Sequence, residues 1–509
     1  MTERHTQKLT GPEYQDARSR DIGEPDVPSQ PYNVILINAD TYRYDNLFDR
    51  AAVPVTTPNL DAFAERAVSL SHFYAGSFPT IPERTDLISG RYAWPWYPWQ
   101  PLAEKNRMPQ LLNQHGYVTQ LICDCPHLFN AGFNQAFNAA YHVRGQEGDM
   151  PFLHMNDPIE TVMPPEKTRT GHHFQDRNLV DLHRWTNRYW RCEEDTFPPR
   201  TAGRAVRWLE ENRQHRPFLL WVDFFDPHEP WDPPEYMVKK YDPSYEGTPM
   251  MHPNYGKASD YTAGELRNLR AHYCAEAELV DRWVGRILQK IDDLDLWDTT
   301  VVIFTTDHGM SLGEHNRTGK SNINKHDDRL WPLYPEIAHI PLLIAAPGLP
   351  RGAAVDILAQ PADILPTLIE LNGLDVAPPD PFQGSSFASA LSVGARTPSR
   401  DFVICGSYLR LRDGKLPPTA VTPMVYTHRW AYAPFGPGDA PYGSGDAPYG
   451  SDEVSPAYHT SELFDLDDDP YGERNVAQEH PDIVEEMHDK LIRWLEEIGA
   501  PDEAIEVYT

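Results

Sequence analysis

The sequence has little cysteine and no long apolar segment. Five cysteines are scattered over 509 residues, and only Cys123 and Cys125 lie close together, so no disulfide framework is expected. One Cys-X-Cys pair is also weak support for a zinc site. No run reaches the roughly 18 apolar residues that a membrane-spanning helix needs, and the polar N-terminus lacks the apolar core of a secretory leader. We therefore expect a cytoplasmic protein with reduced thiols and no membrane partner.

Basic residues are also scarce. Lys and Arg number 45 against 75 Asp and Glu, which gives a formal charge of −30. This balance argues against a nucleic-acid partner or an anionic membrane surface, because both attract basic proteins. A small anionic substrate remains compatible if the site itself supplies cations or a metal. The length suits two to four average domains, or one large α/β unit with an appendage.

Short apolar runs alternate with helical patterns along the chain. Several runs end in acidic residues, at Asp40, Asp124, Asp226 and Asp307. Runs of this kind, rich in Val and Ile, are typical of fully buried strands. We therefore predict an α/β fold with a large, mainly parallel sheet sandwiched by helices. Ligands bind beyond the carboxyl ends of the strands in such sheets.

One helix is clear from its apolar stripe over residues 263–292. Thr262 and Glu265 form a capping box at its start. A second amphipathic pattern closes the chain at 480–500.

The composition divides the chain into three parts. Residues 1–30 resemble an extended arm, 31–400 form the main α/β domain, and 401–509 form a smaller C-terminal α+β subdomain. The last part contains a perfect seven-residue duplication, GDAPYGS, at 438–451, whose Gly, Pro and Ser content is typical of a loop.

A pair of potential metal ligands follows one of the predicted strands. Asp307 and His308 are adjacent, and Asp40 ends the first strand. A carboxylate and an imidazole at one strand end, with a second carboxylate at another, could bind a divalent cation. Alternatively, Asp307 caps the next turn and His308 packs in the core.

The segment SFPTIPERTDLISG predicts a loop that leads into a short helix. Pro82 suits a first helical position, and Gly90 ends the run. Thr80 then lies at the helix N-terminus, where backbone N–H groups and the helix dipole favour an anion, and Arg84 follows one turn later. An ordinary capped surface helix is the simpler explanation of this segment taken alone.

Taken together, the motifs resemble the sulfatase branch of the alkaline phosphatase superfamily. The similarity runs from about residue 32 to 498 and implies that superfamily's fold. It is carried by five segments in the expected order: NVILINADTYRYDNL, TIPERTDLISGRY, FFDPHEPWDPP, TTDHGMSLGEH with the GK that follows it, and ELFDLDDDPYGERNVA.

The resemblance implies a metal site beside a nucleophile. Asp40, Asp307 and His308 would bind one divalent cation, most readily Mn²⁺, with Mg²⁺ or Ca²⁺ as alternatives. Thr80 falls at the position of the nucleophile and would complete the metal's ligands. Arg84 would hold the nucleophile and the anionic group of the substrate.

Further residues receive roles from the same resemblance. His228 and Lys320 would contact the leaving group or the non-bridging oxygens. His228 or His315 is the candidate general acid. His127 aligns loosely with a substrate-binding histidine of the family.

The aromatic loop RYAWPWYPWQP at 91–101 allows two interpretations. Trp94 and Trp96 could wall the substrate pocket, since tryptophan faces attract apolar and cationic groups. The loop could equally form a packed contact between domains or subunits, which would suit a homo-oligomer.

Two departures from the family pattern shape the predicted function. Thr80 replaces the cysteine that sulfatases convert to formylglycine, and Thr41 replaces an acidic metal ligand. A threonyl ester has no second hydroxyl on its carbon, so water must attack the sulfur or phosphorus again to release it. We therefore predict a metal-dependent hydrolase of phosphodiesters or of phosphonate or phosphate monoesters. The alternatives are a sulfate ester hydrolase, a lyase acting on a sulfur compound, and a non-catalytic binding homologue.

Overall fold

A computed structural model of the chain describes residues 30–48, 50–51, 54–151, 154, 156–168, 177–321, 329–393, 400–407, 421–436 and 461–509. Residues 1–29 of the predicted N-terminal arm and the duplication at 438–451 lie outside this part. Among the described helices, none is both long enough and apolar enough to cross a membrane.

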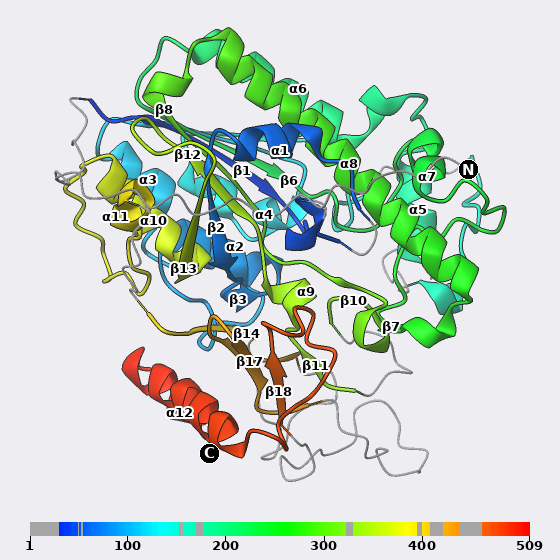
Figure 1. Cartoon of the computed structure of the whole chain (residues 1–509). Helices are drawn as coiled ribbons and strands as arrows, with labels where there is room; N and C mark the ends of the chain where they lie inside the picture. Colours follow the sequence, from blue (N-terminus) through cyan, green and yellow to red (C-terminus); the bar gives the residue numbers. More distant parts are fainter. Residues whose placement is uncertain are drawn as a thin grey trace, which may run out of the picture.

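An eight-stranded sheet forms the centre of the molecule (Figure 1). All its neighbouring pairs are parallel except those of β12, which runs antiparallel to both of its neighbours. The predicted mainly parallel α/β architecture is thus confirmed. In spatial order the strands are β13 (Ala353–Ala359), β2 (Val68–Phe73), β12 (Leu342–Ala345), β8 (Thr300–Thr305), β1 (Asn33–Ala39), β6 (Phe218–Phe224), β4 (Val118–Cys123) and β5 (Ala139–His142).

The central strand β1 shows why the apolar runs are continuous. Val34 and Leu36 pack into the core on one face of the sheet, and Ile35 and Ile37 pack into the core on the other. Successive side chains of a strand point to opposite faces. Every position must therefore be apolar when helices cover both faces.

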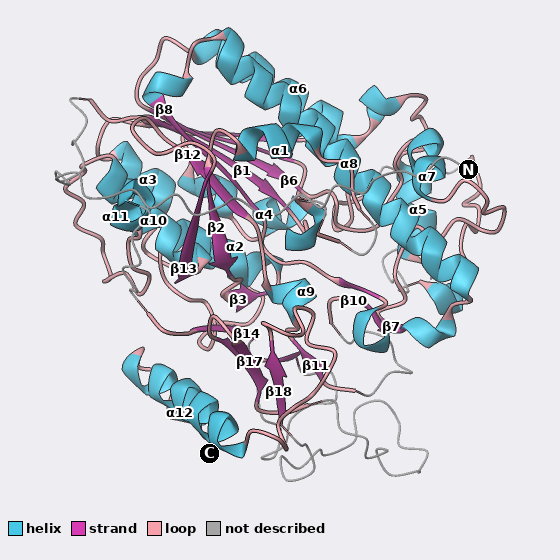
Figure 2. Ribbon diagram, viewed as in Figure 1, coloured by secondary structure: helices cyan, strands magenta, loops and turns pink. Residues whose placement is uncertain are grey.

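Helices cover the sheet on both sides (Figure 2). Their apolar residues divide between the two halves of the core. On one side lie α1 (Pro58–Ala64), α5 (Leu179–Thr186), α6 (Phe197–Asn212) and α8 (Ala263–Asp293), with α7 (Glu235–Tyr241) packed against α8. On the other lie α2 (Thr80–Ser89), α3 (Met108–Asn113), α4 (Pro126–Asn130), α9 (Pro335–Ala338), α10 (Ile364–Leu371) and α11 (Ala388–Val393).

The longest helix, α8, confirms the sequence prediction almost to the residue. The Thr262 side chain accepts a hydrogen bond from the Glu265 N–H, and the Glu265 carboxylate accepts one from the Thr262 N–H, so the capping box is formed. Both bonds satisfy N–H groups that a helix start otherwise leaves without partners.

The C-terminal segment forms a smaller layer below the main sheet in Figure 1. Its sheet has the order β18 (Glu462–Asp465), β17 (Trp430–Ala433), β16 (Met424–Tyr426), β14 (Val403–Ser407) and β3 (Ser77–Phe78). The edge strand β3 comes from the main domain and ends just before Thr80. The C-terminal sheet therefore supports the segment that leads into α2.

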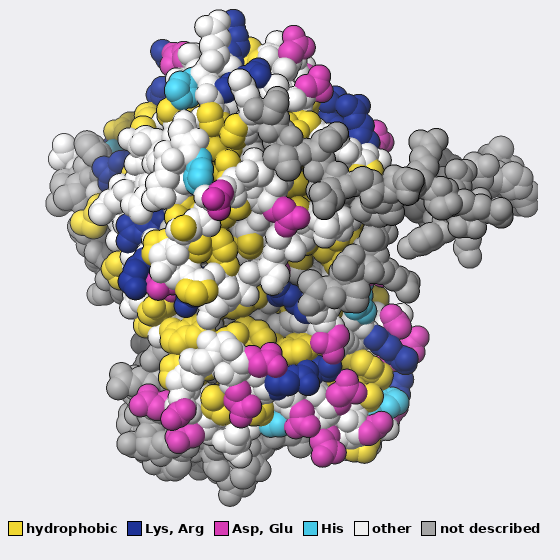
Figure 3. Space-filling model, turned by 90° about the vertical axis from the view of Figure 1, so that its left-hand side faces the viewer, with side chains coloured by type: hydrophobic (Ala, Val, Ile, Leu, Met, Phe, Trp, Pro, Cys, Tyr) yellow, Lys and Arg dark blue, Asp and Glu magenta, His cyan; other side chains and the backbone are white. Residues whose placement is uncertain are grey.

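The remaining elements are short, apart from one helix. Two strand groups are β7 (Gly256–Lys257), β10 (Arg317–Gly319) and β9 (Ser311–Leu312), and β11 (Trp331–Pro332) with β15 (Val421–Thr422). Helices α12 (Pro481–Glu497) and α13 (Asp502–Ile505) close the chain. Seen from the side of α12, acidic and basic side chains lie next to each other over the lower part of the surface (Figure 3).

Candidate active site

The carboxyl ends of two neighbouring strands bring the predicted metal ligands together. Strands β8 and β1 are adjacent and parallel, and β6 lies on the other side of β1. Asp40 directly follows β1, and Asp307 and His308 are the second and third residues after β8. The ligand atoms of these three residues lie within 4.8 Å of one another, and all three side chains are buried.

Thr80 is the first residue of α2. The sequence suggested a helix start at Pro82, but the helix begins two residues earlier. Gly90, whose φ is 67°, caps its C-terminal end. Pro82 is tolerated at the third helical position because the first four N–H groups of a helix have no intrahelical partner. Thr80 is only 2% exposed. Phe78, just before it, packs its ring 4.9 Å from the ring of His308, so this helix start lies beside the metal ligands.

Arg84, one turn into α2, connects the helix to the strand ends. Its Nη2 atom lies 2.9 Å from Asp223 Oδ1 and 3.2 Å from Asp40 Oδ2, and its Nη1 atom contacts Asp307 Oδ2. Glu83 Oε2 is 3.9 Å from Nη1. All five side chains are 0% exposed. The guanidinium therefore fixes the start of α2 against the proposed metal ligands.

The cluster suits a cation because two of its buried atoms are left without hydrogen bonds. Asp40 Oδ2 and His308 Nε2 have no hydrogen-bond partner among the described residues. The Nδ1 atom of His308 lies 3.0 Å from the carbonyl oxygen of Gly309, so it donates its proton there and Nε2 keeps its lone pair. A neutral imidazole in this tautomer is a metal ligand.

Charge gives a second reason to place a cation here. Asp40, Asp223, Asp307 and Glu83 all lie within 4 Å of Arg84. With all four ionised, Arg84 and the nearby Lys320 would leave an excess of two negative charges among these six groups, and without a cation burial raises the pKa of Asp40 and of Glu83 well above their ordinary values. A divalent cation neutralises that excess in a site from which water is excluded.

The pKa values follow from this crowding. Burial and the neighbouring Asp307 raise the pKa of Asp40 well above its ordinary value, against the opposing effects of Arg84 and Lys320. Burial alone would raise the pKa of Asp307, but Arg84, His308 and Lys320 hold it below its ordinary value. Burial lowers the pKa of His308 to about 4, so its ring is neutral at neutral pH. Asp307 is thus the permanent anion of the cluster.

A hydrogen-bonded chain joins the metal ligands to Lys320. The Thr41 hydroxyl donates to Asp40 Oδ1 at 2.7 Å and accepts from Lys320 Nζ at 3.3 Å. Lys320 Nζ also lies 3.9 Å from Glu229 Oε2, and Glu229 accepts a hydrogen bond from the Tyr255 hydroxyl. Thr41 therefore positions both Asp40 and Lys320.

His228 is brought to the same region with a defined tautomer. Its Nδ1 atom lies 2.6 Å from the Glu229 carbonyl oxygen and donates to it. Burial holds the pKa of His228 well below its ordinary value, although Glu229 opposes the shift. The ring stacks on Phe225 at 4.0 Å. His228 is therefore neutral at neutral pH and presents Nε2 as a proton acceptor.

His127 lies close to His228 through a shared aromatic neighbour. Its ring meets Phe225 edge-on at 5.5 Å and Trp99 edge-on at 5.0 Å. His127 and His228 therefore contact the same ring, and the substrate-binding role of His127 stays a prediction. It also adds Trp99 from the aromatic loop, a residue that sequence reasoning did not single out.

His315 is held by groups at the start of α9 and in the C-terminal segment. Its ring stacks on Tyr334 at 3.6 Å, and Nε2 lies 3.1 Å from the Tyr471 carbonyl oxygen and 3.5 Å from Glu336 Oε2. Burial alone would lower the pKa of His315, but the Glu336 carboxylate raises it overall. These contacts link His315 to the C-terminal segment, and its role as the general acid stays a prediction.

The two tryptophans of the aromatic loop differ in their surroundings. Trp94 is 2% exposed and belongs to the hydrophobic core of the C-terminal layer. Its indole stacks on Trp494 of α12 at 5.4 Å. This is the packed contact that the loop allowed as an alternative, so Trp94 is not proposed as a substrate-binding residue. Trp96 is half-buried and stays a prediction.

Sequence reasoning missed three buried acids around the site. Asp223 interrupts the apolar strand β6, and Glu229 directly follows His228. Glu83 stands beside Arg84, and neither of its carboxylate oxygens has a hydrogen-bond partner among the described residues. Asp223 could have been identified from the sequence, because it lies inside an otherwise apolar run and a buried carboxylate needs a cationic partner.

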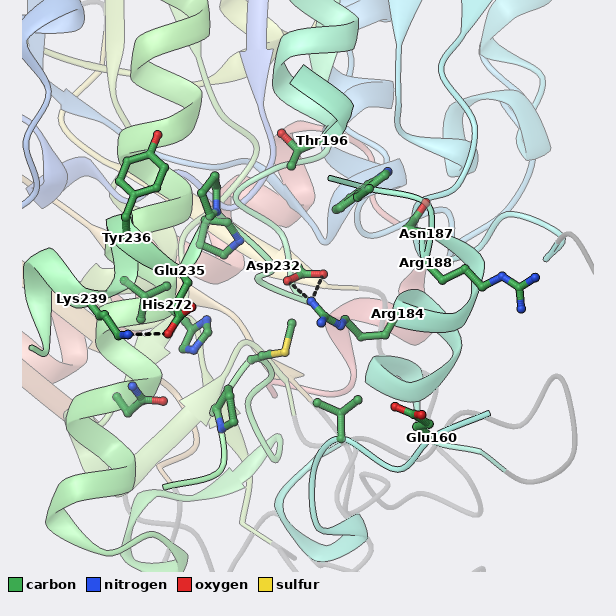
Figure 4. A pocket seen from close by; sticks show the side chains of 18 of the residues that line it. Glu160, Arg184, Asn187, Arg188, Thr196, Asp232, Glu235, Tyr236, Lys239 and His272 are labelled. Atoms are coloured by element: carbon green, nitrogen blue, oxygen red, sulfur yellow. Dashed lines mark hydrogen bonds and ion pairs between the residues drawn. The ribbon is translucent and has the colours of Figure 1, made fainter. Parts of the chain in front are cut away.

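A cavity of about 1520 Å³ lies elsewhere, between α5, α7 and the start of the loop after His228 (Figure 4). Arg184 pairs there with Asp232, and Lys239 pairs with Glu235. The cavity shares no lining residue with the metal cluster. We therefore place the chemistry at the strand ends and not in this cavity.

Comparison with known proteins agrees with this geometry. The sequence profile described as Sulfatase matches residues 32–374, more than half of the chain. The chain belongs to the sulfatase family. Arylsulfatase K of Mus musculus is 24% identical over 496 residues, covering 91% of this chain and 79% of that protein.

Solved structures support the fold of this sulfatase-family protein. The phosphonate monoester hydrolase of Agrobacterium radiobacter is similar with a TM-score of 0.67 and 24% identity, covering 92% of this chain and 96% of that one. A structure in complex with its substrate D-glucosamine-2-N,6-O-disulfate is similar with a TM-score of 0.63 and 16% identity, covering 93% and 99%.

Membership of the sulfatase family tests the predictions about catalysis and metal binding. The protein is an ester hydrolase of a family that uses a divalent metal ion, and Asp40, Asp307 and His308 are the residues that could hold that ion. The alternative of a non-catalytic homologue is therefore dropped. Arylsulfatase K, the relative compared above, is named for a sulfate ester and not for the phosphodiester predicted first.

Proposed function

We propose that this protein hydrolyses a sulfate ester of a small organic molecule, with Thr80 as the nucleophile. The observation that carries the proposal is the placement of Thr80 at the start of a helix that Arg84 ties to Asp40 and Asp307. A divalent cation held by Asp40, Asp307 and His308 would act as a Lewis acid toward the ester and its nucleophile.

The chain's own residues would bind and orient the substrate. The N-terminus of α2 offers backbone N–H groups and a positive dipole to the ester's oxygens. Arg84 and Lys320 supply positive charge, and burial strengthens their attraction for the ester because water is excluded. His228 Nε2 is an acceptor for a proton released at the nucleophile.

The reaction would run in two displacements. The Thr80 hydroxyl gives its proton to His228 as its oxygen bonds to sulfur, the bond from sulfur to the alcohol oxygen breaks, and the leaving oxygen takes that proton from His228. Water then bonds to the same sulfur, the bond to the Thr80 oxygen breaks, and sulfate leaves as the hydroxyl is reprotonated. Both steps pass through sulfur, since a threonyl ester cannot release sulfate by breaking its own carbon–oxygen bond.

A phosphonate or phosphate ester is the second candidate, and Thr80 itself favours it. Phosphorus accepts a second in-line displacement readily when cations balance its equatorial oxygens. The fold is shared with a phosphonate monoester hydrolase.

The deciding experiment measures nitrophenol release from nitrophenyl sulfate, nitrophenyl phenylphosphonate and bis-nitrophenyl phosphate, with Mn²⁺, Mg²⁺ or Ca²⁺ added to the dialysed protein. We expect kcat/KM to be highest for the sulfate. The highest value on a phosphorus ester would instead select the second candidate.

Two substitutions test the nucleophile. Thr80→Ala should reduce kcat by at least about 10³-fold, as removal of a nucleophile does elsewhere, whereas Thr80→Ser should keep part of the activity. Thr85→Ala is the matched control, because Thr85 lies on the same helix and its hydroxyl donates to the Ile81 carbonyl oxygen. Equal rates for Thr80→Ala and Thr85→Ala would contradict the assignment.

A further inference from the structure

We propose that the protein carries a second metal site, specific for Zn²⁺ and similar transition ions, built by His72, Asp356 and His428. Their ligand atoms all lie within 4.8 Å of one another. None of the three residues belongs to the active site. The proposal is therefore independent of the proposed function.

The distances within the group suit one small ion. His72 Nδ1 lies 2.9 Å from Asp356 Oδ1, and His428 Nε2 lies 3.5 Å from the same oxygen. The two imidazole rings are 4.8 Å apart and inclined at 64°. Ligands placed tetrahedrally at about 2.0–2.1 Å from zinc are roughly 3.3 Å apart. Small movements of exposed side chains would therefore complete the coordination.

One atom of the group is buried close to the other ligands. His72 Nδ1 lies 2.9 Å from Asp356 Oδ1, in an ion-pair contact that lacks hydrogen-bond geometry. A buried imidazole nitrogen beside a carboxylate and a second imidazole is a metal-ligand arrangement.

A β-bulge places the carboxylate of this group. Strands β2 and β13 are paired, with Val355 opposite Leu70 and Leu358 opposite His72. Strand β13 therefore has one more residue than β2 between these pairs. The irregularity includes Asp356, and bulges of this kind change the direction of a side chain. Here the bulge coincides with the approach of Asp356 to His72.

The third ligand comes from the C-terminal layer. His428 lies in the tight turn between β16 and β17, which the Thr427 N–H closes by donating to the Trp430 carbonyl oxygen at 2.9 Å. The side chains of His72, Asp356 and His428 are 24%, 44% and 43% exposed, so an ion can reach them from solvent. Water can fill the fourth position.

The ligand set favours zinc over the hard cations. Two imidazoles and one carboxylate are typical of Zn²⁺ and its transition-metal neighbours, whereas Ca²⁺ and Mg²⁺ prefer oxygen ligands. Bound zinc would join the main sheet to the C-terminal layer across more than 350 residues of sequence. It would also fix β2, the strand that precedes β3 and Thr80.

The test counts zinc bound by the dialysed full-length protein with ZnCl₂ alone, using a chromogenic chelator as competitor. We expect His428→Ala to bind one zinc ion fewer per chain than the native protein, or to bind it at least about tenfold more weakly. Zinc should raise the melting temperature of the native protein by more than that of the variant. His428 is an exposed turn residue, so the variant should fold.

His215→Ala is the matched control, since His215 is exposed on the loop after α6. Its zinc count and melting temperature should equal those of the native protein. Asp356→Asn should behave as His428→Ala does. The proposal is overturned if His428→Ala and Asp356→Asn bind as much zinc as the native protein with unchanged affinity.

Discussion

Replacing Arg84 by methionine is the most informative perturbation of the site. Methionine keeps the length of the side chain and removes its charge. The change leaves Asp223 and Asp307 buried without their cationic partner. Breaking a buried ion pair in this way costs about 3–5 kcal/mol.

The loss of stability expected for Arg84→Met depends on the interactions that the neighbouring acids keep. Asp223 Oδ2 keeps the hydrogen bonds donated by Trp221 Nε1 at 3.0 Å and Asn38 Nδ2 at 3.3 Å. Asp40 can take up a proton, because burial already raises its pKa. The free energy of unfolding should therefore fall by about 3 kcal/mol, the lower end of the range for one broken buried ion pair. The costs of losing all three pairs of Arg84 should not add up.

Urea unfolding of the Arg84→Met variant should be measured in EDTA and in millimolar Mn²⁺. The deficit should be smaller in Mn²⁺, because binding to the folded state adds stability and the more negative site binds the cation more tightly. Arg207→Met is the control, since its pair with Glu211 is solvent-exposed, and it should cost less than about 1 kcal/mol. An Arg84→Met deficit below about 1 kcal/mol, or one that Mn²⁺ leaves unchanged, would contradict a buried ion-pair cluster that binds a cation.

Three further predictions concern parts of the molecule outside the metal cluster. Burial lowers the pKa of His272 to about 4 from 6.5. Between these two pH values only the unfolded chain binds a proton at His272, so the free energy of unfolding falls as the pH drops through this range. His272→Gln should remove about 2 kcal/mol of the loss measured by urea unfolding between about pH 7.5 and 5, and an unchanged pH profile would contradict this. Thr262→Ala should destabilise the start of α8 by about 0.5–2 kcal/mol, and hydrogen exchange that stays unchanged in its first turn would count against the cap. Trp94→Ala should cost about 3–5 kcal/mol and leave KM unchanged because its indole packs on Trp494; a raised KM at unchanged stability would return Trp94 to the substrate pocket.

Local chemistry made much of the fold predictable. The apolar run of β1 is continuous because both faces of the strand are covered, and Thr262 with Glu265 marks the start of α8 in the sequence alone. The antiparallel direction of β12 could not be predicted, since a short apolar run has the same residue pattern in a parallel and in an antiparallel strand. The two-residue strand β3 could not be predicted from the sequence either, because its partner β14 lies more than 300 residues away.

The site was predictable to the extent that its residues stand at strand ends. Asp40, Asp307 and His308 were found in this way, and the structure groups them. The crowding of acids around Arg84 was not predictable, since Asp223 and Glu83 reach it from a strand and a helix that only the tertiary fold brings together. The tautomers of His228 and His308 depend on backbone carbonyls and left no signal in the sequence.

The metal site at the strand ends is tested most directly by counting bound metal ions. Mn²⁺ binding should be measured for His428→Ala, which lacks the proposed surface site, and for the same variant with His308→Gln added. We predict one Mn²⁺ ion per chain for the first protein and none for the second, with ester hydrolysis lost in parallel. Equal Mn²⁺ binding and equal hydrolysis by the two proteins would contradict it.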